Sequence, residues 1–152
     1  MTWQRGADRV RQLVADGRLE VVSGAAADGS ELLASAQGLL LSSHREHDVN
    51  PEAAFILAYD AARKACASLL AQQGLRTKSA GHHVTTEEVV RAQFGGPFDE
   101  FGGLRRRRVE IEYPRHPGDV VTLDEMSDAY VAAASIVDAA SALLPTLSLF
   151  RA

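Results

Sequence analysis

Cysteine is nearly absent from the chain, which has one, Cys66, among its 152 residues. An intrachain disulfide and a metal site built from several cysteines are therefore excluded. A chain without disulfides suits a reducing compartment, and we expect a cytoplasmic location. The first twelve residues have no apolar segment of the kind found in signal peptides. The longest apolar runs are short and interrupted by polar residues, so we expect no segment that spans a membrane.

The chain also lacks an excess of positive charge. Its 16 Lys and Arg residues stand against 20 Asp and Glu residues, which gives a net charge of −4. This balance disfavours broad, sequence-independent coating of nucleic acid by the whole surface. A local basic patch stays open, and the run from Arg105 to Arg108 is the place for one. There is no glycine-rich phosphate loop, because the glycines of GGPF (95–98) precede Pro and Phe rather than Lys and Ser.

Strand signals are scarce, and most of the sequence has the three-and-four spacing of amphipathic helices. Leu19, Val21 and Val22 alternate only briefly, in a turn-like setting, and residues 75–84 are expected to form a loop. The expected helices are 3–15, a second one from Ser30 into SSHREHDVN (42–50), then 51–73, 85–94, 98–113 and 122–144.

Four of these helices begin with a residue pattern that favours capping. The expected N-terminal signals are Ser30, Asn50 followed by Pro51, the capping box Thr85 with Glu88, and the capping box Thr122 with Glu125. The helix after Asn50 is apolar on most sides, so we expect it at the centre of the fold. The last helix has a coiled-coil-like apolar seam, which suits near-parallel packing either within the chain or with a second copy.

Together these elements predict an all-α, up-and-down bundle of four to five main helices plus an N-terminal helix. The length suits a single domain, 1–152. Within it, 1–28 would form the N-terminal helix and connector, and 30–144 the bundle.

The arginine-rich helix carries the first chemical signal. Phe101, Leu104, Arg108 and Ile111 share one face by their spacing, and that face should be the buried one. Arg108 therefore stands where an apolar residue is expected, and a guanidinium there needs a partner. Pairing of Arg108 with Glu112, and of Arg106 with Glu110, is compatible with the i,i+4 spacing. The alternative is a solvated, salt-bridged helix face.

The central helix carries a second signal, because Asp60, Arg63 and Lys64 interrupt its apolar character in one sector. Asp60 and Lys64 are an i,i+4 pair. If the two helices pack side by side, Asp60 could face Arg108. The alternative is that these three residues mark the one wet edge of the helix.

Histidines give no convincing metal site. His82 and His83 are adjacent, and neighbouring residues on a loop rarely bind one ion together. His44 and His47 can share a helix face, but a solvated role is favoured there. We therefore expect no metal and no cofactor.

Two segments resemble the HEPN superfamily of small helical bundles. They are AYDAARKACASLLAQQG (58–74) and LRRRRVEIEYP (104–114), with GHHV (81–84) resembling the connecting loop and ELLASAQGLL (31–40) the first bundle helix. The resemblance covers roughly residues 30–144. It implies a helical bundle, a homodimer, and a setting in toxin–antitoxin, defence or stress systems.

Many HEPN proteins are metal-independent RNases, with an arginine followed after a few residues by a histidine. The resemblance places Arg108 at the arginine, but Tyr113 stands where the histidine is expected. A tyrosine with a reference pKa of about 10 is a poor base at neutral pH, whereas an arginine can still bind a phosphate. Binding is therefore favoured over catalysis. If catalysis occurs, Arg108 and Tyr113 are the expected catalytic residues, and the expected ligand-binding residues are Arg105, Arg106, Arg107, Asp60 and Arg63.

Three functional hypotheses follow. In the first, the chain binds RNA or a nucleotide through its arginine-rich helix. In the second, it is a metal-independent endoribonuclease centred on Arg108. In the third, it is an interaction module with a protein partner such as a separately encoded nucleotidyltransferase.

Overall fold

The computed structural model describes residues 3–78 and 81–151, and it confirms the all-α prediction. Over these residues the chain forms six α-helices, three short 3₁₀ helices and one two-stranded sheet. The elements are α1 (Ala7–Ala15), β1 (Leu19–Val21), η1 (Gly24–Ala26), α2 (Ser30–Glu46), α3 (Pro51–Gln72), β2 (Leu75–Thr77), α4 (His82–Gln93), η2 (Gly96–Glu100), α5 (Phe101–Glu112), α6 (Leu123–Leu143) and η3 (Leu144–Thr146).

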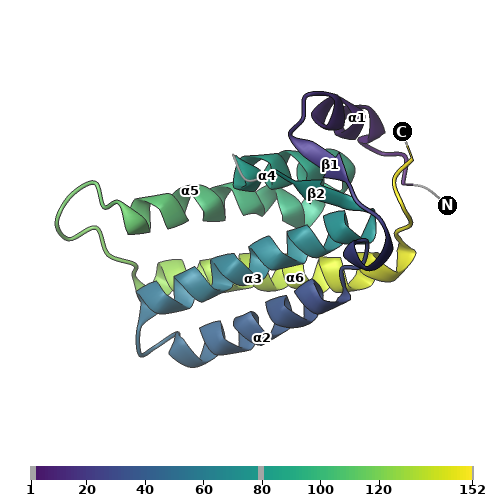
Figure 1. Ribbon diagram of the computed structural model, residues 1–152. Coiled ribbons are helices and arrows are strands. Elements are labelled where there is room, and N and C mark those ends of the chain that lie inside the picture. The colour runs from purple at the N-terminus through teal and green to yellow at the C-terminus, as the bar shows by residue number, and fades with distance from the viewer. Residues whose placement is uncertain (1–2, 79–80, 152) are drawn as a thin grey trace.

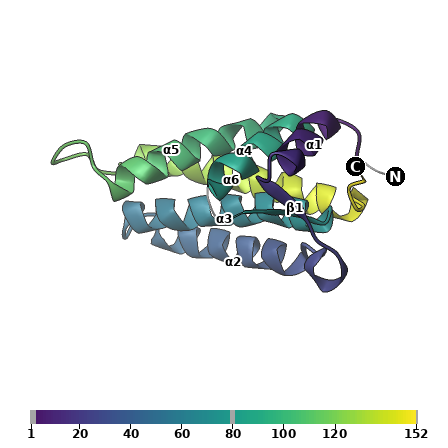
Figure 2. The ribbon, with the colours of Figure 1, turned by 45° about the horizontal axis from the view of Figure 1, so that its top comes forward.

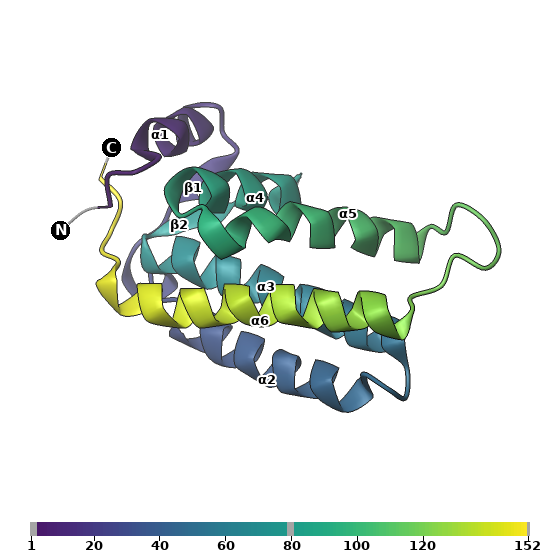
Figure 3. The same cartoon turned by 180° about the vertical axis from the view of Figure 1, so that it is seen from behind.

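Helix α3 lies at the centre of the bundle, as its sequence predicts. It has α2 on one side and α4 and α5 on the other, and α6 runs along its back (Figures 1 and 3). Alanines at 54, 58, 61, 62 and 65 are fully buried, and their small side chains let neighbouring helices approach α3 closely. Because neighbours cover α3 on most sides, its backbone is held in place, and so are the points from which its polar side chains extend.

The ends of α3 follow the expected local chemistry. The Asn50 side chain accepts a hydrogen bond from the Ala53 N–H at 3.1 Å, and Pro51 is the first helical residue. After the helix, Gly74 adopts φ +70°, which an L side chain rarely tolerates. Both signals in the sequence are confirmed.

The expected cap of α2 is wrong by one residue. Ser30 is already helical, and Gly29 occupies the capping position without a side chain. A Cβ on Gly29 would lie 2.0 Å from the Ser68 carbonyl oxygen, so only glycine fits between α2 and α3. Asp28 accepts from the Ser30 N–H at 2.8 Å instead.

The expected start of α4 is also wrong. The helix begins at His82, after Gly81 in a left-handed conformation, and Thr85 lies buried inside it rather than capping it. Thr85 and Glu88 both bind the Arg18 guanidinium, at 3.1 and 2.7 Å. The supposed capping box is thus a pair of tertiary contacts, and the region expected to be a loop contributes one more helical turn.

The segment before α2 packs on the bundle through a small sheet that the sequence pattern did not predict. One strand, β1, belongs to this segment, and the other, β2, follows α3. Strand β1 pairs antiparallel with β2, with Glu20 opposite Arg76. Three residues are too few to show alternation, so the pairing depends on tertiary contact. The Trp3 indole N–H also donates to the Gln93 carbonyl at 2.9 Å. Figure 2 shows α1 and β1 gathered at one end of the bundle.

Helix α6 begins as predicted, because the Thr122 hydroxyl accepts from the Glu125 N–H at 3.1 Å. Met126, Ala133 and Val137 of its apolar seam are buried against the bundle. This packing shows that the seam is used within the chain.

By length and composition alone, α6 and its extension are apolar enough to cross a membrane. The stretch Leu123–Thr146 has a mean hydropathy of 1.4. In the fold, α6 packs against α2 and α3. The expectation that no segment spans a membrane, like the cytoplasmic location, therefore stays a prediction.

Candidate functional site

The pocket of greatest chemical interest lies where α3, α4 and α5 meet. It has a volume of about 430 Å³. Helix α3 contributes Tyr59 and Asp60, the first turn of α4 contributes His83, and α5 contributes Arg105, Arg108, Val109 and Glu112. Asp60 and Arg108, which stand far apart along the chain, line the same cavity. The volume falls within the range of small-molecule sites.

Arg108 sits at the edge of the face that the helical spacing defines. Phe101, Leu104 and Ile111 on that face are buried, whereas the Arg108 side chain is 26% exposed. Its guanidinium binds the Glu112 carboxylate at 3.2 Å, the i,i+4 pair that the sequence suggests. Because Glu112 is half-exposed, this pair is of the weak surface kind. Arg108 can therefore exchange its partner for a ligand at small cost.

Asp60 is held only loosely by its own helix. Its nearest cation is Arg63, with the Nε atom 3.6 Å from the carboxylate oxygen, which is an ion pair but too long for a hydrogen bond. The expected Asp60–Lys64 pair does not form among the described residues. Lys64 reaches across to α2 instead and donates to the Ser35 hydroxyl at 2.9 Å. The polar sector of α3 is thus divided between two sides of the helix.

Tyr59 and His83 form a coupled pair in the wall of the pocket. The Tyr59 hydroxyl is hydrogen-bonded to Nδ1 of His83, and the two rings stack with centroids 5.9 Å apart. Burial raises the pKa of Tyr59 to about 12, so the phenol stays protonated. Burial, then the neighbouring His82 and Arg63, lower the pKa of His83 from its ordinary value. A neutral imidazole is therefore favoured at physiological pH.

Tyr59 and His83 are site residues that the sequence does not predict. The available signal for Tyr59 is its position in the apolar stripe of α3, because a buried tyrosine hydroxyl needs a hydrogen-bonding partner. The sequence predicts a loop at His83, and only the earlier start of α4 brings His83 into contact with Tyr59 of α3. Nothing in the local sequence specifies that start beyond the glycine at position 81.

The buried carboxylate of Glu87 fixes α5 against α4. Its side chain is 9% exposed, and it accepts from Arg105 Nε at 2.9 Å, with Arg106 and Arg91 each at 3.7 Å. A Cβ on Gly102 would lie 2.1 Å from a Glu87 oxygen, so glycine makes this approach possible. Arg105 lines the pocket, but its charge is already matched by Glu87. Arg106 is well exposed and lies outside the pocket lining.

Arg107 points to the opposite side of α5. It binds Glu125 of α6 at 2.5 Å, Asp119 of the intervening loop at 3.0 Å and Glu110 at 3.3 Å. The hydrogen bonds that Arg107 donates to Glu125 and Asp119 raise its pKa further above the ordinary arginine value. These contacts give Arg107 a role in joining α5 to α6.

Tyr113 ends α5 and is 70% exposed, and it does not belong to the pocket lining. The backbone leaves the helix at this residue, as expected before Pro114. Within the described chain, the structure therefore brings Arg108 together with Asp60 and His83 rather than with Tyr113.

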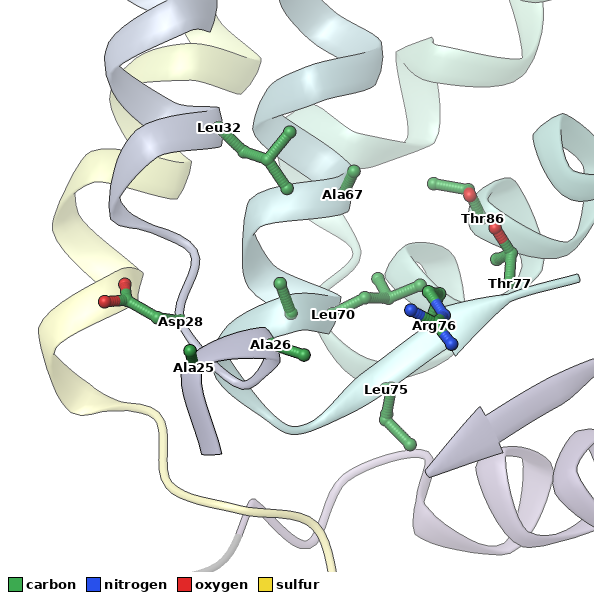
Figure 4. A pocket seen from close by; sticks show the side chains of 11 residues that line it. Ala25, Ala26, Asp28, Leu32, Ala67, Leu70, Leu75, Arg76, Thr77 and Thr86 are labelled. Carbon is green, nitrogen blue, oxygen red and sulfur yellow. The ribbon is translucent and has the colours of Figure 1, made fainter. Parts of the chain in front are cut away.

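A second pocket, shown in Figure 4, is mainly apolar. Alanines and leucines of η1, α2, α3 and β2 form most of its lining, and Arg76, Thr77 and Thr86 gather at one end (Figure 4). The Arg76 guanidinium is bound to Glu20 at 2.7 Å. This pocket offers less chemistry than the one at α3, α4 and α5.

Over residues 3–78 and 81–151, no three His, Cys, Asp or Glu side chains are close enough to hold a metal ion. His44 packs on the Tyr130 ring, and His47 is hydrogen-bonded to Asp48 and Ser127. The expectation of a site without metal or cofactor stays a prediction.

No family model matches the chain, and neither the curated proteins nor the solved structures compared with it give a match. The fold and the site define the chain as an all-α bundle with an arginine-containing pocket between three helices. Membership of the HEPN superfamily stays a resemblance.

Proposed function

We propose that the chain is a HEPN-like helical bundle that binds RNA or a nucleotide, with a phosphate held by Arg108 in the pocket between α3, α4 and α5. The observation that carries this proposal is the convergence of Arg108, His83 and Asp60 on one cavity. The proposed biological setting is a toxin–antitoxin, defence or stress system. Experiments in cells would follow once ligand binding is established.

Arg108 is the arginine best suited to an incoming phosphate. A guanidinium matches the geometry of phosphate oxygens and can donate two hydrogen bonds to them. Arg105 and Arg107 are occupied by buried or half-buried carboxylates, which a ligand would have to displace. Arg108 has only the exposed Glu112 as a partner among the described residues.

The cavity is of a size for one nucleotide rather than a duplex. Proteins recognise single-stranded RNA by taking splayed nucleotides into such pockets and stacking bases on aromatic side chains, including histidine. His83 lines this pocket, half-buried, with its ring stacked on Tyr59. The net charge of −4 adds no general attraction to RNA, so binding should depend on this pocket.

Metal-independent RNA cleavage is a second candidate, and His83 favours it. The histidine that is missing from α5 has a spatial counterpart on α4, in the same pocket as Arg108. In the tautomer whose Nδ1–H donates to the Tyr59 oxygen, Nε2 of the neutral imidazole is free to take the proton of a ribose 2′-hydroxyl, while arginine stabilises charge on the phosphate. In this form the base would be His83 rather than Tyr113.

The test is binding of a fluorescent single-stranded RNA in the presence of EDTA, with the RNA run afterwards on a denaturing gel. Arg108→Ala should weaken binding about tenfold or more, because a charged hydrogen bond is worth roughly 1.5–3 kcal/mol. Arg115→Ala is the matched control, since Arg115 is 76% exposed and lies outside the pocket lining. It should change affinity less than about twofold.

Each result points to one hypothesis. Cleavage lost in His83→Gln would establish the nuclease. Binding without cleavage, weakened by Arg108→Ala only, would establish the binding protein. Equal effects of both arginine substitutions would place the RNA elsewhere. Absence of RNA and nucleotide binding would favour the interaction module with a protein partner.

A further inference from the structure

The pocket between α3, α4 and α5 is not built for a bare anion. Two arginines and two carboxylates line it, and one of the arginines, Arg105, is already matched by Glu87 outside the lining. An inorganic phosphate bound to Arg108 would therefore face Asp60 and Glu112 at close range, and like charges repel. A ligand that fits must bring hydrogen-bond donors as well as its phosphate.

The Asp60 carboxylate can accept hydrogen bonds from a ligand. Its carboxylate makes one ion pair, to Arg63 at 3.6 Å, and no hydrogen bond with any other described residue. A carboxylate has about four acceptor positions and donates nothing when ionised. Asp60 stands on the central α3, and its side chain is 39% exposed, so a ligand can reach the carboxylate without breaking a hydrogen bond of the fold. It is therefore an accessible acceptor in the same pocket as the phosphate-binding arginine.

We infer that the pocket selects ribonucleotides over deoxyribonucleotides, with Asp60 accepting a hydrogen bond from the ribose 2′-hydroxyl. This inference rests on the proposed binding of a phosphate at Arg108. The 2′-hydroxyl is a donor that sits on the sugar next to the phosphate, and it is the group by which proteins distinguish RNA from DNA. An exocyclic amine lies on the far side of the base, away from the phosphate.

The experiment compares four single-stranded oligonucleotides of equal length: oligo(U), oligo(dU), 2′-fluoro oligo(U) and 2′-O-methyl oligo(U). The base is the same in all four, and the 2′-fluoro sugar keeps a ribose-like pucker without the donor. Wild-type protein should bind oligo(U) about tenfold more tightly than the other three, as expected when a charged acceptor loses its donor. Gel analysis confirms that the oligonucleotides stay intact.

Substitutions at Asp60 identify the acceptor. Asp60→Ala should bring the affinity for oligo(U) to the level for oligo(dU), and Asp60→Asn, which keeps one acceptor oxygen, should retain part of the preference. Asp138→Ala removes the same charge from an exposed position of α6, outside the pocket lining, and should leave the preference unchanged.

The outcomes separate this inference from the proposed function. Equal affinity of the wild type for oligo(U) and oligo(dU), with both weakened by Arg108→Ala, would overturn the inference and leave phosphate binding at Arg108 standing. A preference for ribose that persists in Asp60→Ala would also overturn it. If wild-type protein binds none of the four, the inference and the proposed function both fail.

Discussion

Glu112 competes with a ligand phosphate for Arg108, so its removal should strengthen binding. The two side chains are 3.2 Å apart in an exposed ion pair, a kind worth roughly 0.2–1 kcal/mol. Glu112→Gln should therefore tighten the binding of single-stranded RNA by up to about fivefold in a fluorescence titration. Asp138→Asn, which removes one negative charge away from the pocket, serves as the control for net charge. Weaker binding by Glu112→Gln would show that Glu112 contacts the ligand directly.

His83 should make the fold less stable in mild acid. Its pKa is lowered in the folded state, so the unfolded chain binds the proton more readily, and stability rises with pH up to the ordinary histidine value of 6.5. The contribution is lost as pH falls through that window toward the lowered pKa. The charged groups that act on His83 are Asp60, Arg63, His82 and Arg105.

Urea unfolding at pH 5.5 and pH 7.5 measures this contribution. The wild type should lose more stability on acidification than His83→Gln, which keeps a polar side chain at the position but cannot titrate. An identical loss in both proteins would mean that other groups carry the pH dependence. Carboxylates elsewhere in the fold affect both proteins alike, so the difference isolates His83.

The packing of α5 on α4 depends on one glycine, and a neighbouring glycine provides its control. Gly102→Ala would place a Cβ 2.1 Å from a Glu87 oxygen and displace the buried carboxylate from Arg105. We expect a loss of about 1–3 kcal/mol, typical of overpacking. Gly103→Ala meets no atom within 4 Å and should stabilise the helix by about 0.5–1 kcal/mol. Denaturant unfolding of the two variants should therefore give shifts of opposite sign.

Local chemistry accounts for the helices whose ends the sequence predicted well. Asn50 and Thr122 have side chains that bond backbone N–H groups three residues on, and such signals do not depend on the rest of the fold. Ser30 and Thr85 show the limit. Ser30 does not cap α2, because Gly29, in close contact with α3, occupies the capping position. Thr85 does not cap α4, because its hydroxyl accepts a hydrogen bond from Arg18, 67 residues away.

For the site residues as well, the sequence predicts only part of the arrangement, because the rest depends on segments that are distant along the chain. The apolar pattern of α3 and α5 was enough to suggest that Asp60 and Arg108 face each other across a helix interface. It could not show that Arg107 turns toward α6, because that depends on Asp119 in the loop after α5 and on Glu125 in the first turn of α6. His83 reaches the pocket only because α4 starts early. The periodicity of apolar residues predicts which face of a helix is buried, but it does not predict contacts with segments that are distant along the chain.

Arg107 should hold the α5–α6 connection against the bundle. Its removal should therefore destabilise that connection more than the rest of the fold. Its side chain is 19% exposed and forms ion pairs with Asp119, Glu110 and Glu125. Arg107→Met keeps the aliphatic stem but leaves three carboxylates facing one another. We expect a loss of about 1–3 kcal/mol, below the cost of breaking a fully buried pair because solvent still reaches the cluster.

Hydrogen exchange can separate this local effect from general destabilisation. Amides of residues 113–122 and of the first turn of α6 should exchange faster in Arg107→Met, while those of α2 and the second half of α3 keep their protection under native conditions. Arg115→Met, at an exposed arginine that binds only Glu110 among the described residues, should leave both regions nearly unchanged. RNA binding should survive in Arg107→Met, because Arg108, Asp60 and His83 lie on the other side of α5. Loss of binding without unfolding would instead assign Arg107 to the ligand and move the proposed site toward α6.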